Sequence, residues 1–154
     1  SSFAKTREVL ADLGLDHIDE TRMTHELSGG QQQRLAFARA ILPDFTVLFG
    51  DEPTGNLDSD NAVKAMELLT AKLSSLSGSS AIIVSHDMHL AVSFADVIVK
   101  IRKESRPSAS VKDEVSYYGV IDDKSVFTTD HNGKWSNGAE EYSPLEFERY
   151  LKKW

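Results

Sequence analysis

The segment Leu27–Arg34, with the sequence LSGGQQQR, constrains the fold of this chain more than any other stretch. Ser28 is a favourable N-cap for a helix, and the two glycines after it allow the backbone to approach an anion closely. The N–H groups and the dipole of a helix N-terminus favour negative charge. The segment therefore predicts a helix from Gln31 to Leu42 that can contact a phosphate at its start and that ends at Pro43.

Alternating strands and helices follow this helix. The apolar runs at 45–49 and 80–85 predict two buried strands, and 97–101 predicts a third. Helices are expected over about 60–76 and 87–95, and the body of the 31–42 helix is apolar nearly all round, which is typical of a buried helix. Strands that alternate with helices predict a parallel sheet with right-handed crossovers, so we expect an α/β fold.

The composition changes after Arg102. Residues 103–114 are polar and contain a proline, which predicts a loop or linker. Strands are expected at 116–121 and 125–129, a hairpin turn at Asn132-Gly133 and a terminal helix that begins at Ser143-Pro144. We therefore expect 104–154 to be a small C-terminal β-hairpin and helix, with a mini-core of aromatic residues: Tyr117, Tyr118, Phe127 and Trp135.

Charge, cysteine content and the length of the apolar runs exclude several classes of partner and site. The chain has 17 basic and 24 acidic side chains, and its formal net charge of −7 argues against a nucleic-acid-binding surface. The chain has no cysteine, which excludes disulfides and thiolate metal sites. Its apolar runs are much shorter than the about 20 residues of a membrane-spanning helix.

Acidic residues follow the first predicted strand directly. Asp51 can orient Mg²⁺, which binds few protein oxygens, and Glu52 can polarise an attacking water molecule. His86, at the end of the neighbouring strand, can reach the γ-phosphate of a bound triphosphate and the same water molecule. His86 and His89 have no third ligand at a recognisable spacing, so we do not expect them to form a metal site.

Four motifs resemble those of ATP-binding cassette (ABC) transporter ATPases. They are the signature Leu27–Gln31, the Walker B strand Val47–Glu52, the D-loop Gly55–Asp58 and the switch histidine at the end of Val84–His86. The resemblance covers residues 1–101. The sequence of Glu52–Asp58 is similar to that of the family branch that serves lipoprotein release, macrolide or peptide export and cell division. The resemblance implies a partial P-loop NTPase domain over 1–103, with 1–30 as the remnant of a helical subdomain and 31–103 as half of the ATPase core.

The resemblance implies that one group of residues serves the nucleotide of a neighbouring subunit. Ser28, Gly29 and Gly30 would contact the γ-phosphate of ATP held by the opposite subunit, with Gln31 nearby. Asp58 would cross the dimer interface and couple the two sites. The implied partners are a second nucleotide-binding subunit and a transmembrane transporter subunit. That arrangement would place the protein in the cytoplasm, on the face of the cell membrane, and it includes no nucleic acid.

A second group would act on ATP in its own subunit. Asp51 would serve Mg²⁺, Glu52 would be the general base, and His86 would hold the γ-phosphate and the water. The implied cofactors are therefore ATP and Mg²⁺ in the complete subunit.

The chain departs from the family at the phosphate-binding loop. Neither Gly-x-x-x-x-Gly-Lys-Ser/Thr nor the glutamine loop occurs before the signature, and Gly50–Gly55 continues as Asn56-Leu57. Without that loop most of the affinity for a triphosphate is absent. We therefore expect this chain to be inactive alone, although the whole subunit would be an ATPase. The alternative is a non-catalytic half-site or interaction module that lends its signature and D-loop to another subunit's ATP.

The resemblance also implies an open sheet edge. In such ATPases the strand before the phosphate-binding loop separates the strand that ends at His86 from the strand at 97–101. Without it, apolar edges with unpaired N–H and C=O groups remain. We hypothesise that the chain closes this gap by rearranging strands, by using its tail (residues 104–154), or by pairing with a second copy.

Overall fold

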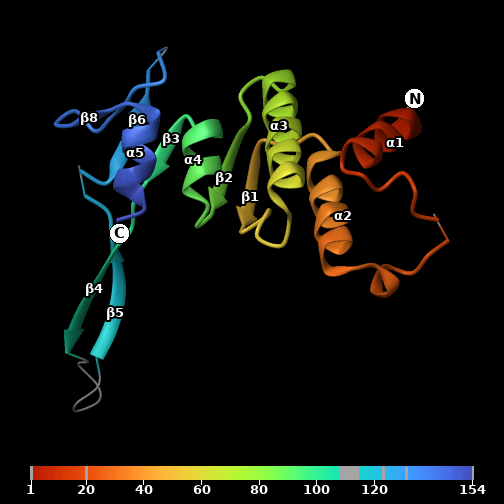
Figure 1. The fold of residues 1–154 in the computed structure, drawn as a ribbon, viewed down its shortest axis with the longest axis horizontal. Coiled ribbons are helices and arrows are strands. Elements are labelled where there is room, and N and C mark those ends of the chain that lie inside the picture. The colour runs from red at the N-terminus through yellow and green to blue at the C-terminus, as the bar shows by residue number, and fades with distance from the viewer. Residues whose placement is uncertain (1, 20, 108–114, 123, 131, 154) are drawn as a thin grey trace. The chain divides into compact units, whose positions relative to one another are not determined.

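The computed structural model describes residues 2–19, 21–107, 115–122, 124–130 and 132–153. The chain divides into two compact units, Ser1–Leu90 and Ala91–Trp154. Figure 1 shows the helices and strands of both units in chain order. Within the described ranges, no helix is both long enough and apolar enough to cross a membrane.

The first unit is mainly helical. Its elements are α1 (Ser2–Asp12), the short 3-10 helix η1 (Thr24–Glu26), α2 (Gly29–Ile41), β1 (Val47–Asp51), α3 (Ser59–Ser75), β2 (Ser80–Val84) and the start of α4 (Met88–Phe94). After α1, Gly14 has φ 64° and its N–H donates to the Ala11 carbonyl at 2.8 Å. Gly14 therefore ends this helix as a left-handed glycine C-cap.

Strands β1 and β2 pair in parallel, from Val47↔Ser80 to Asp51↔Val84, as predicted for these two strands. The inward side chains of Leu48, Ala81 and Ile83 pack on the helical core. The expectation of strands buried on both faces is wrong. The exposed fractions of the outward side chains are 43% for Val47, 74% for Phe49, 53% for Ile82 and 59% for Val84. Successive side chains of a strand point to opposite faces, and the helical core covers one face only.

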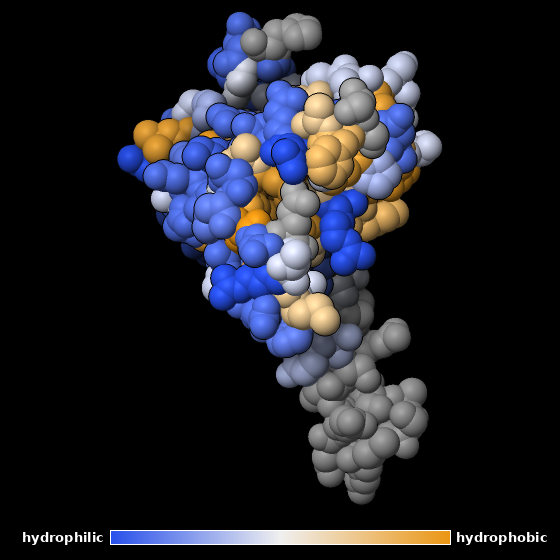
Figure 2. All heavy atoms as spheres, turned by 90° about the vertical axis from the view of Figure 1, so that its right-hand side faces the viewer, coloured by the Kyte–Doolittle hydropathy of each residue, from blue (hydrophilic) through white to orange (hydrophobic). Residues whose placement is uncertain are grey.

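The core of the first unit is mainly aliphatic, with Phe37 as its aromatic member. Its fully or almost fully buried members are Leu13, Leu15, Phe37, Ala38, Ile41, Ala65 and Leu69. On α2 only Phe37, Ala38 and Ile41 are buried, so the prediction of a helix buried all round is wrong. The surface on the side of α1 and α2 combines many hydrophilic side chains with apolar ones between them (Figure 2). A hollow of about 230 Å³ in the first unit is lined by residues that include Leu10, Leu15, Ile18, Leu27 and Leu35.

Helix α3 packs Leu69, Met66 and Leu73 into or against the core of the first unit. Ala62, Ala65 and Lys72 are its other buried residues. Lys72 is tolerated because its Nζ donates to Asp44 Oδ1 at 2.7 Å and to the Leu42 carbonyl at 3.3 Å. This contact joins α3 to the segment that enters β1.

The second unit is mainly antiparallel. It contains β3 (Val97–Val99), β4 (Arg102–Pro107), β5 (Val115–Val120), β6 (Val126–Thr129), β7 (Trp135–Ser136), β8 (Glu141–Tyr142) and α5 (Pro144–Leu151). The sheet order is β3-β6-β7-β8, with a separate β4-β5 ribbon. Gly133, with φ 74°, lies between β6 and β7, as the hairpin signal predicts. Pro144 occupies the predicted first position of α5.

Two predictions for this region are wrong. The strand expected at 97–101 does not continue the parallel sheet, because β3 pairs antiparallel with β6. The loop expected over 103–114 is strand β4 up to Pro107, and 108–114 lie outside the described residues. Both strands pair with segments of the tail, which satisfies backbone groups that an isolated strand would leave unpaired. The tail thus pairs with β3, one of the two strands that flank the hypothesised gap. Among the described residues the other strand, β2, pairs only with β1, so its edge is not closed.

An aromatic core holds the second unit together. Phe127, Trp135 and Phe147 are at most 1% exposed, and the Trp135 and Phe147 rings stack with centroids 5.1 Å apart. Tyr117 is 64% exposed, so its assignment to this core is wrong, and the side chain of Tyr118 lies outside the described part. Tyr117 instead lies under the Lys103 ammonium, whose Nζ is 3.9 Å from the ring centroid.

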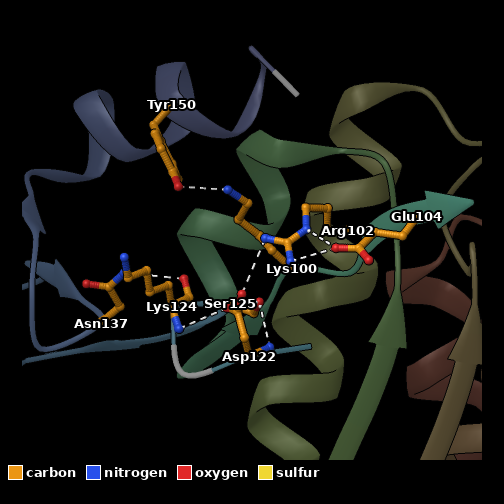
Figure 3. A network of polar contacts seen from close by, with 8 residues as sticks. All are labelled: Lys100, Arg102, Glu104, Asp122, Lys124, Ser125, Asn137 and Tyr150. Atoms are coloured by element: carbon orange, nitrogen blue, oxygen red, sulfur yellow. Dashed lines mark hydrogen bonds and ion pairs between the residues drawn. The ribbon is translucent and has the colours of Figure 1, made fainter. Parts of the chain in front are cut away.

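Polar contacts join the ribbon to the rest of the second unit (Figure 3). The Arg102 guanidinium contacts Glu104 at 2.9 Å and Asp122 at 3.3 Å. Ser125 Oγ donates to Asp122 Oδ1 at 2.8 Å, and this hydrogen bond is the largest cause of the lowered pKa of Asp122. Lys100 Nζ donates to the Tyr150 hydroxyl at 2.8 Å, which ties the end of β3 to α5.

Candidate active site

The first turn of α2 presents the predicted phosphate-contacting residues. Ser28 is the N-cap: its Oγ accepts from the Gln31 N–H at 3.2 Å, and Gln31 Oε1 accepts from the Ser28 N–H at 2.9 Å. This capping box fixes the helix start. A Cβ added to Gly29 would meet nothing within 4 Å, so the space beside that residue is open. The turn combines an exposed serine hydroxyl with helix N–H groups that favour an anion.

The turn after β1 holds Glu52 in an uncommon backbone conformation. Asp51 is the last residue of β1, and Glu52 follows with φ 46°, the only positive φ of a non-glycine residue in the described ranges. The Glu52 N–H donates to the Val84 carbonyl at 2.8 Å, and its carbonyl accepts from the Gly55 N–H at 3.1 Å. A left-handed glutamate costs about 1–3 kcal/mol and persists only where its neighbours hold it.

Glu52 and His86 meet at the carboxyl end of the parallel strand pair. Glu52 Oε1 lies 2.8 Å from His86 Nδ1, and the two side chains are 37% and 79% exposed, respectively. The hydrogen bond to Glu52, and then the charge of Glu52, raise the pKa of His86 above its ordinary value of 6.5. Because parallel strands end at the same sheet edge, residues 34 positions apart in sequence become direct partners.

The segment between β1 and α3 brings the predicted D-loop beside α2. Asp58 caps α3, since its carboxylate accepts from the Asn61 N–H at 3.0 Å and from Asn61 Nδ2 at 2.6 Å. These bonds, and then the charge of Arg34, lower the pKa of Asp58. A Cβ on Gly30 would lie 3.4 Å from the Asn56 carbonyl oxygen. Gly30 therefore permits a close approach of α2 to this segment.

Gln33 is a residue of the site that the sequence did not single out. Its Nε2 donates to the Glu52 carbonyl at 2.9 Å, and its Oε1 accepts from the Asn56 N–H at 3.0 Å. Three consecutive glutamines gave no signal that distinguished this one. The neighbouring Arg34 has the one buried side-chain nitrogen or oxygen without a hydrogen-bond partner in the described part, its Nε.

The acidic residues fit a cation that takes most of its ligands from phosphate and water. Asp51 offers one exposed carboxylate at the end of β1. The residues that the structure describes contain no group of three or more His, Cys, Asp or Glu side chains able to hold a metal ion. Mg²⁺ typically binds through one or two carboxylates together with substrate phosphates, so Asp51 suits Mg²⁺ that arrives with a nucleotide.

The sequence of this chain is similar to those of known proteins. Residues 1–55 match the family model described as ABC transporter. The chain is 45% identical over 95 residues to the lipoprotein-releasing system ATP-binding protein LolD of Syntrophotalea carbinolica, a match that covers 60% of this chain and 40% of the relative. It is 36% identical over 138 residues to the macrolide export ATP-binding/permease protein MacB of Chlorobium phaeobacteroides, covering 86% of this chain and 20% of the relative.

A solved structure of an ABC transporter protein is also similar to this chain. The dimeric structure of a bacterial ABC transporter cassette is similar with a TM-score of 0.53 and 36% identity, over 62% of this chain and 40% of that one. The chain is therefore similar to ABC transporter ATP-binding proteins over most of its length, and it has the fold of part of their α/β ATPase domain. It spans two fifths or less of the length of these relatives. The predicted resemblance to lipoprotein-release and macrolide-export proteins is confirmed.

The match to MacB also bears on the tail. Residues 1–103 are about two thirds of the chain, so a match that covers 86% of it extends into the region after residue 103. The tail is therefore similar in sequence to a part of that relative, beyond the four motifs.

Proposed function

We propose that the chain contributes to ATP hydrolysis by an ABC ATPase that drives transport across a membrane. The observation that carries this proposal is the 2.8 Å contact between Glu52 and His86, at the end of two parallel strands and next to Asp51. It joins a carboxylate able to accept a proton from water with an imidazole able to donate to a phosphate oxygen. The family supports ATP as the substrate.

In this proposal each residue of the sheet edge has a task. Glu52 takes the proton of the attacking water; His86 contacts one of its carboxylate oxygens, and a second oxygen remains for the water. His86 orients the γ-phosphate, and Asp51 holds Mg²⁺. Mg²⁺, when bound with the nucleotide, neutralises phosphate charge.

The start of α2 serves a second nucleotide in this proposal. Ser28, Gly29 and Gly30 contact the γ-phosphate of ATP held by an opposite subunit, Gln31 keeps the cap in place, and Asp58 crosses the interface. The exposed capping box and the open space at Gly29 support this role. The partners are a second nucleotide-binding subunit and a transmembrane subunit, which puts the protein at the cytoplasmic face of the membrane. The names of the relatives and the dimeric cassette support these partners.

The test supplies the missing phosphate-binding loop. The N-terminal part of the LolD relative, up to the start of its match with this chain, is added as a separate polypeptide, and ATP hydrolysis is measured. We expect no turnover by either polypeptide alone and turnover by the mixture. Glu52→Gln should lower this turnover by about 100-fold or more, because a general base contributes about 10²–10⁴ to a rate.

A matched variant serves as the control, and two outcomes would contradict the proposal. Glu67→Gln makes the same change at an exposed position of α3 and should leave turnover unchanged. A mixture whose turnover survives Glu52→Gln would contradict the role of Glu52. Hydrolysis by the chain alone, abolished by Glu52→Gln, would contradict its inactivity.

A second candidate is a non-catalytic module that lends Ser28–Gln31 and Asp58 to another subunit's ATP. It is favoured by the exposed capping box of Ser28 and Gln31 and by the open space beside Gly29. In the mixture, this role predicts that Ser28→Ala lowers turnover while Glu52→Gln does not. The coding sequence upstream of Ser1 gives an independent answer, since a glycine-rich loop and a glutamine loop in the same frame would favour the catalytic role.

A further inference from the structure

The side chain of Gln33 connects helix α2 to the turn after β1. Both ends of its carboxamide are used, since Nε2 donates to the Glu52 carbonyl at 2.9 Å and Oε1 accepts from the Asn56 N–H at 3.0 Å. Gln33 is half-buried, so these bonds are partly shielded from water. One side chain thus holds both the start and the end of the segment between Glu52 and Asn56.

The two preceding glutamines do not make this connection. Gln31 closes the capping box with Ser28, and Gln32 Nε2 donates to the Leu27 carbonyl at 2.9 Å. Both contacts stay at the start of α2. Gln33 alone among the three has a described hydrogen bond to the segment after β1.

Glu52 needs such support because of its backbone conformation. Its φ of 46° lies in the left-handed region, where a Cβ is unfavourable. Main-chain bonds hold its N–H to Val84 and its carbonyl to Gly55. Gln33 provides the described side-chain bond to the same carbonyl. The direction of the Glu52 side chain, and so its contact with His86, depends on this backbone conformation.

We propose that Gln33 is a positioning residue that keeps Glu52 in the left-handed conformation directing its carboxylate to His86. The inference rests on the proposed function in one respect, the role of Glu52 as the base. It adds a link that the motifs do not contain: the helix that begins with Ser28, Gly29 and Gly30 is tied to the base through Gln33. A displacement at the start of α2 is therefore transmitted to Glu52.

The test is NMR on the 154-residue chain, with Gln33→Met compared with Gln32→Met. Three readouts are followed: exchange of the Asn56 amide, φ of Glu52 from its HN–Hα coupling, and titration of the His86 imidazole. In Gln33→Met we expect Asn56 to exchange about fivefold faster, since one hydrogen bond contributes about 1 kcal/mol. Glu52 leaves positive φ and the pKa of His86 falls toward its ordinary value. Gln32→Met should change none of the three.

The outcomes separate positioning from simple structural support. If Asn56 exchanges faster while Glu52 and His86 keep their wild-type values, Gln33 only fastens the turn and the proposal is overturned. If Gln33→Met does not fold, Gln33→Glu replaces it, because it keeps the acceptor for Asn56 and removes the donor for Glu52. Positive φ at Glu52 in that variant would equally overturn the proposal. ATP turnover enters no readout, so failure of the proposed function is seen separately in the hydrolysis assay.

Discussion

The two units of this chain differ in what holds them together and in what they carry. The first contains every predicted site residue, from Ser28 to His86, on a mainly aliphatic core with one sheet face exposed. The second contains none of them and closes an aromatic core around Phe127, Trp135 and Phe147. Sheets of parallel strands normally have both faces covered. The first unit therefore has the organisation of part of a domain, whereas the tail has a core of its own.

The largest effect is expected from Phe147→Ala. Removing a fully buried ring that stacks on Trp135 should cost about 3–5 kcal/mol and unfold the second unit. The first unit should keep its structure, because the two cores share no residue. Hydrogen exchange resolved by residue measures both units. The control Leu145→Ala, at a 59% exposed position of the same helix, should change stability by no more than about 0.5 kcal/mol. Equal loss of protection in α2 and α5 would show that the units are one cooperative body.

Leu69→Ala should destabilise the first unit and leave the stability of the second unchanged. This side chain is 2% exposed in the core of the first unit, and its truncation should cost about 2–5 kcal/mol in that unit only. Phe49→Ala is the matched comparison, since it removes a larger side chain that is 74% exposed and should cost about 0.5 kcal/mol or less. Urea unfolding followed by unit-specific signals measures both. A cost at Phe49 as large as that at Leu69 would mean that the outer face of β1–β2 is covered in solution.

Asp44→Asn should have a smaller, pH-dependent effect on the first unit. The hydrogen bond from Lys72, and then its charge, lower the pKa of Asp44 below 3.8. This contact therefore adds stability above pH 3.8 that is lost as the pH falls through the lowered pKa. We expect the variant to be less stable than the wild type at neutral pH and equally stable below that pKa. A difference that persists at the lowest pH would mean that charge is not its source.

The smallest effect on stability is expected at Glu52 and His86, which are exposed. Because Glu52 raises the pKa of His86, the stabilising contribution of the pair is complete below pH 6.5 and is lost as the pH rises through the raised pKa. In Glu52→Gln the His86 pKa should fall, and this part of the pH dependence should disappear. Titration of the imidazole by NMR measures the pKa directly. His17, which lies outside the site, provides the reference histidine in the same spectra. An unchanged His86 pKa in the variant would exclude the contact in solution.

Much of the site and of the local structure was predictable from short sequence signals. Ser28, Asp58 and Ser143-Pro144 mark helix starts through bonds or backbone angles within a few residues, and each begins a helix in the structure. The predicted strands, 45–49 and 80–85, end within two residues of the observed ends at Asp51 and Val84, because the apolar runs end close to them. These features depend on neighbours in the chain, which the sequence displays directly.

Only the tertiary structure decided which distant groups meet. The sequence indicated a strand at 97–101 but not its antiparallel partner β6, since hydrogen-bond pairing leaves no mark on a single strand. It indicated Glu52 and His86 as functional but not their direct contact, nor the part played by Gln33. An apolar strand has the same composition whether one or both of its faces are covered. The exposed side of β1–β2 was therefore decided by which elements the chain contributes to pack against it.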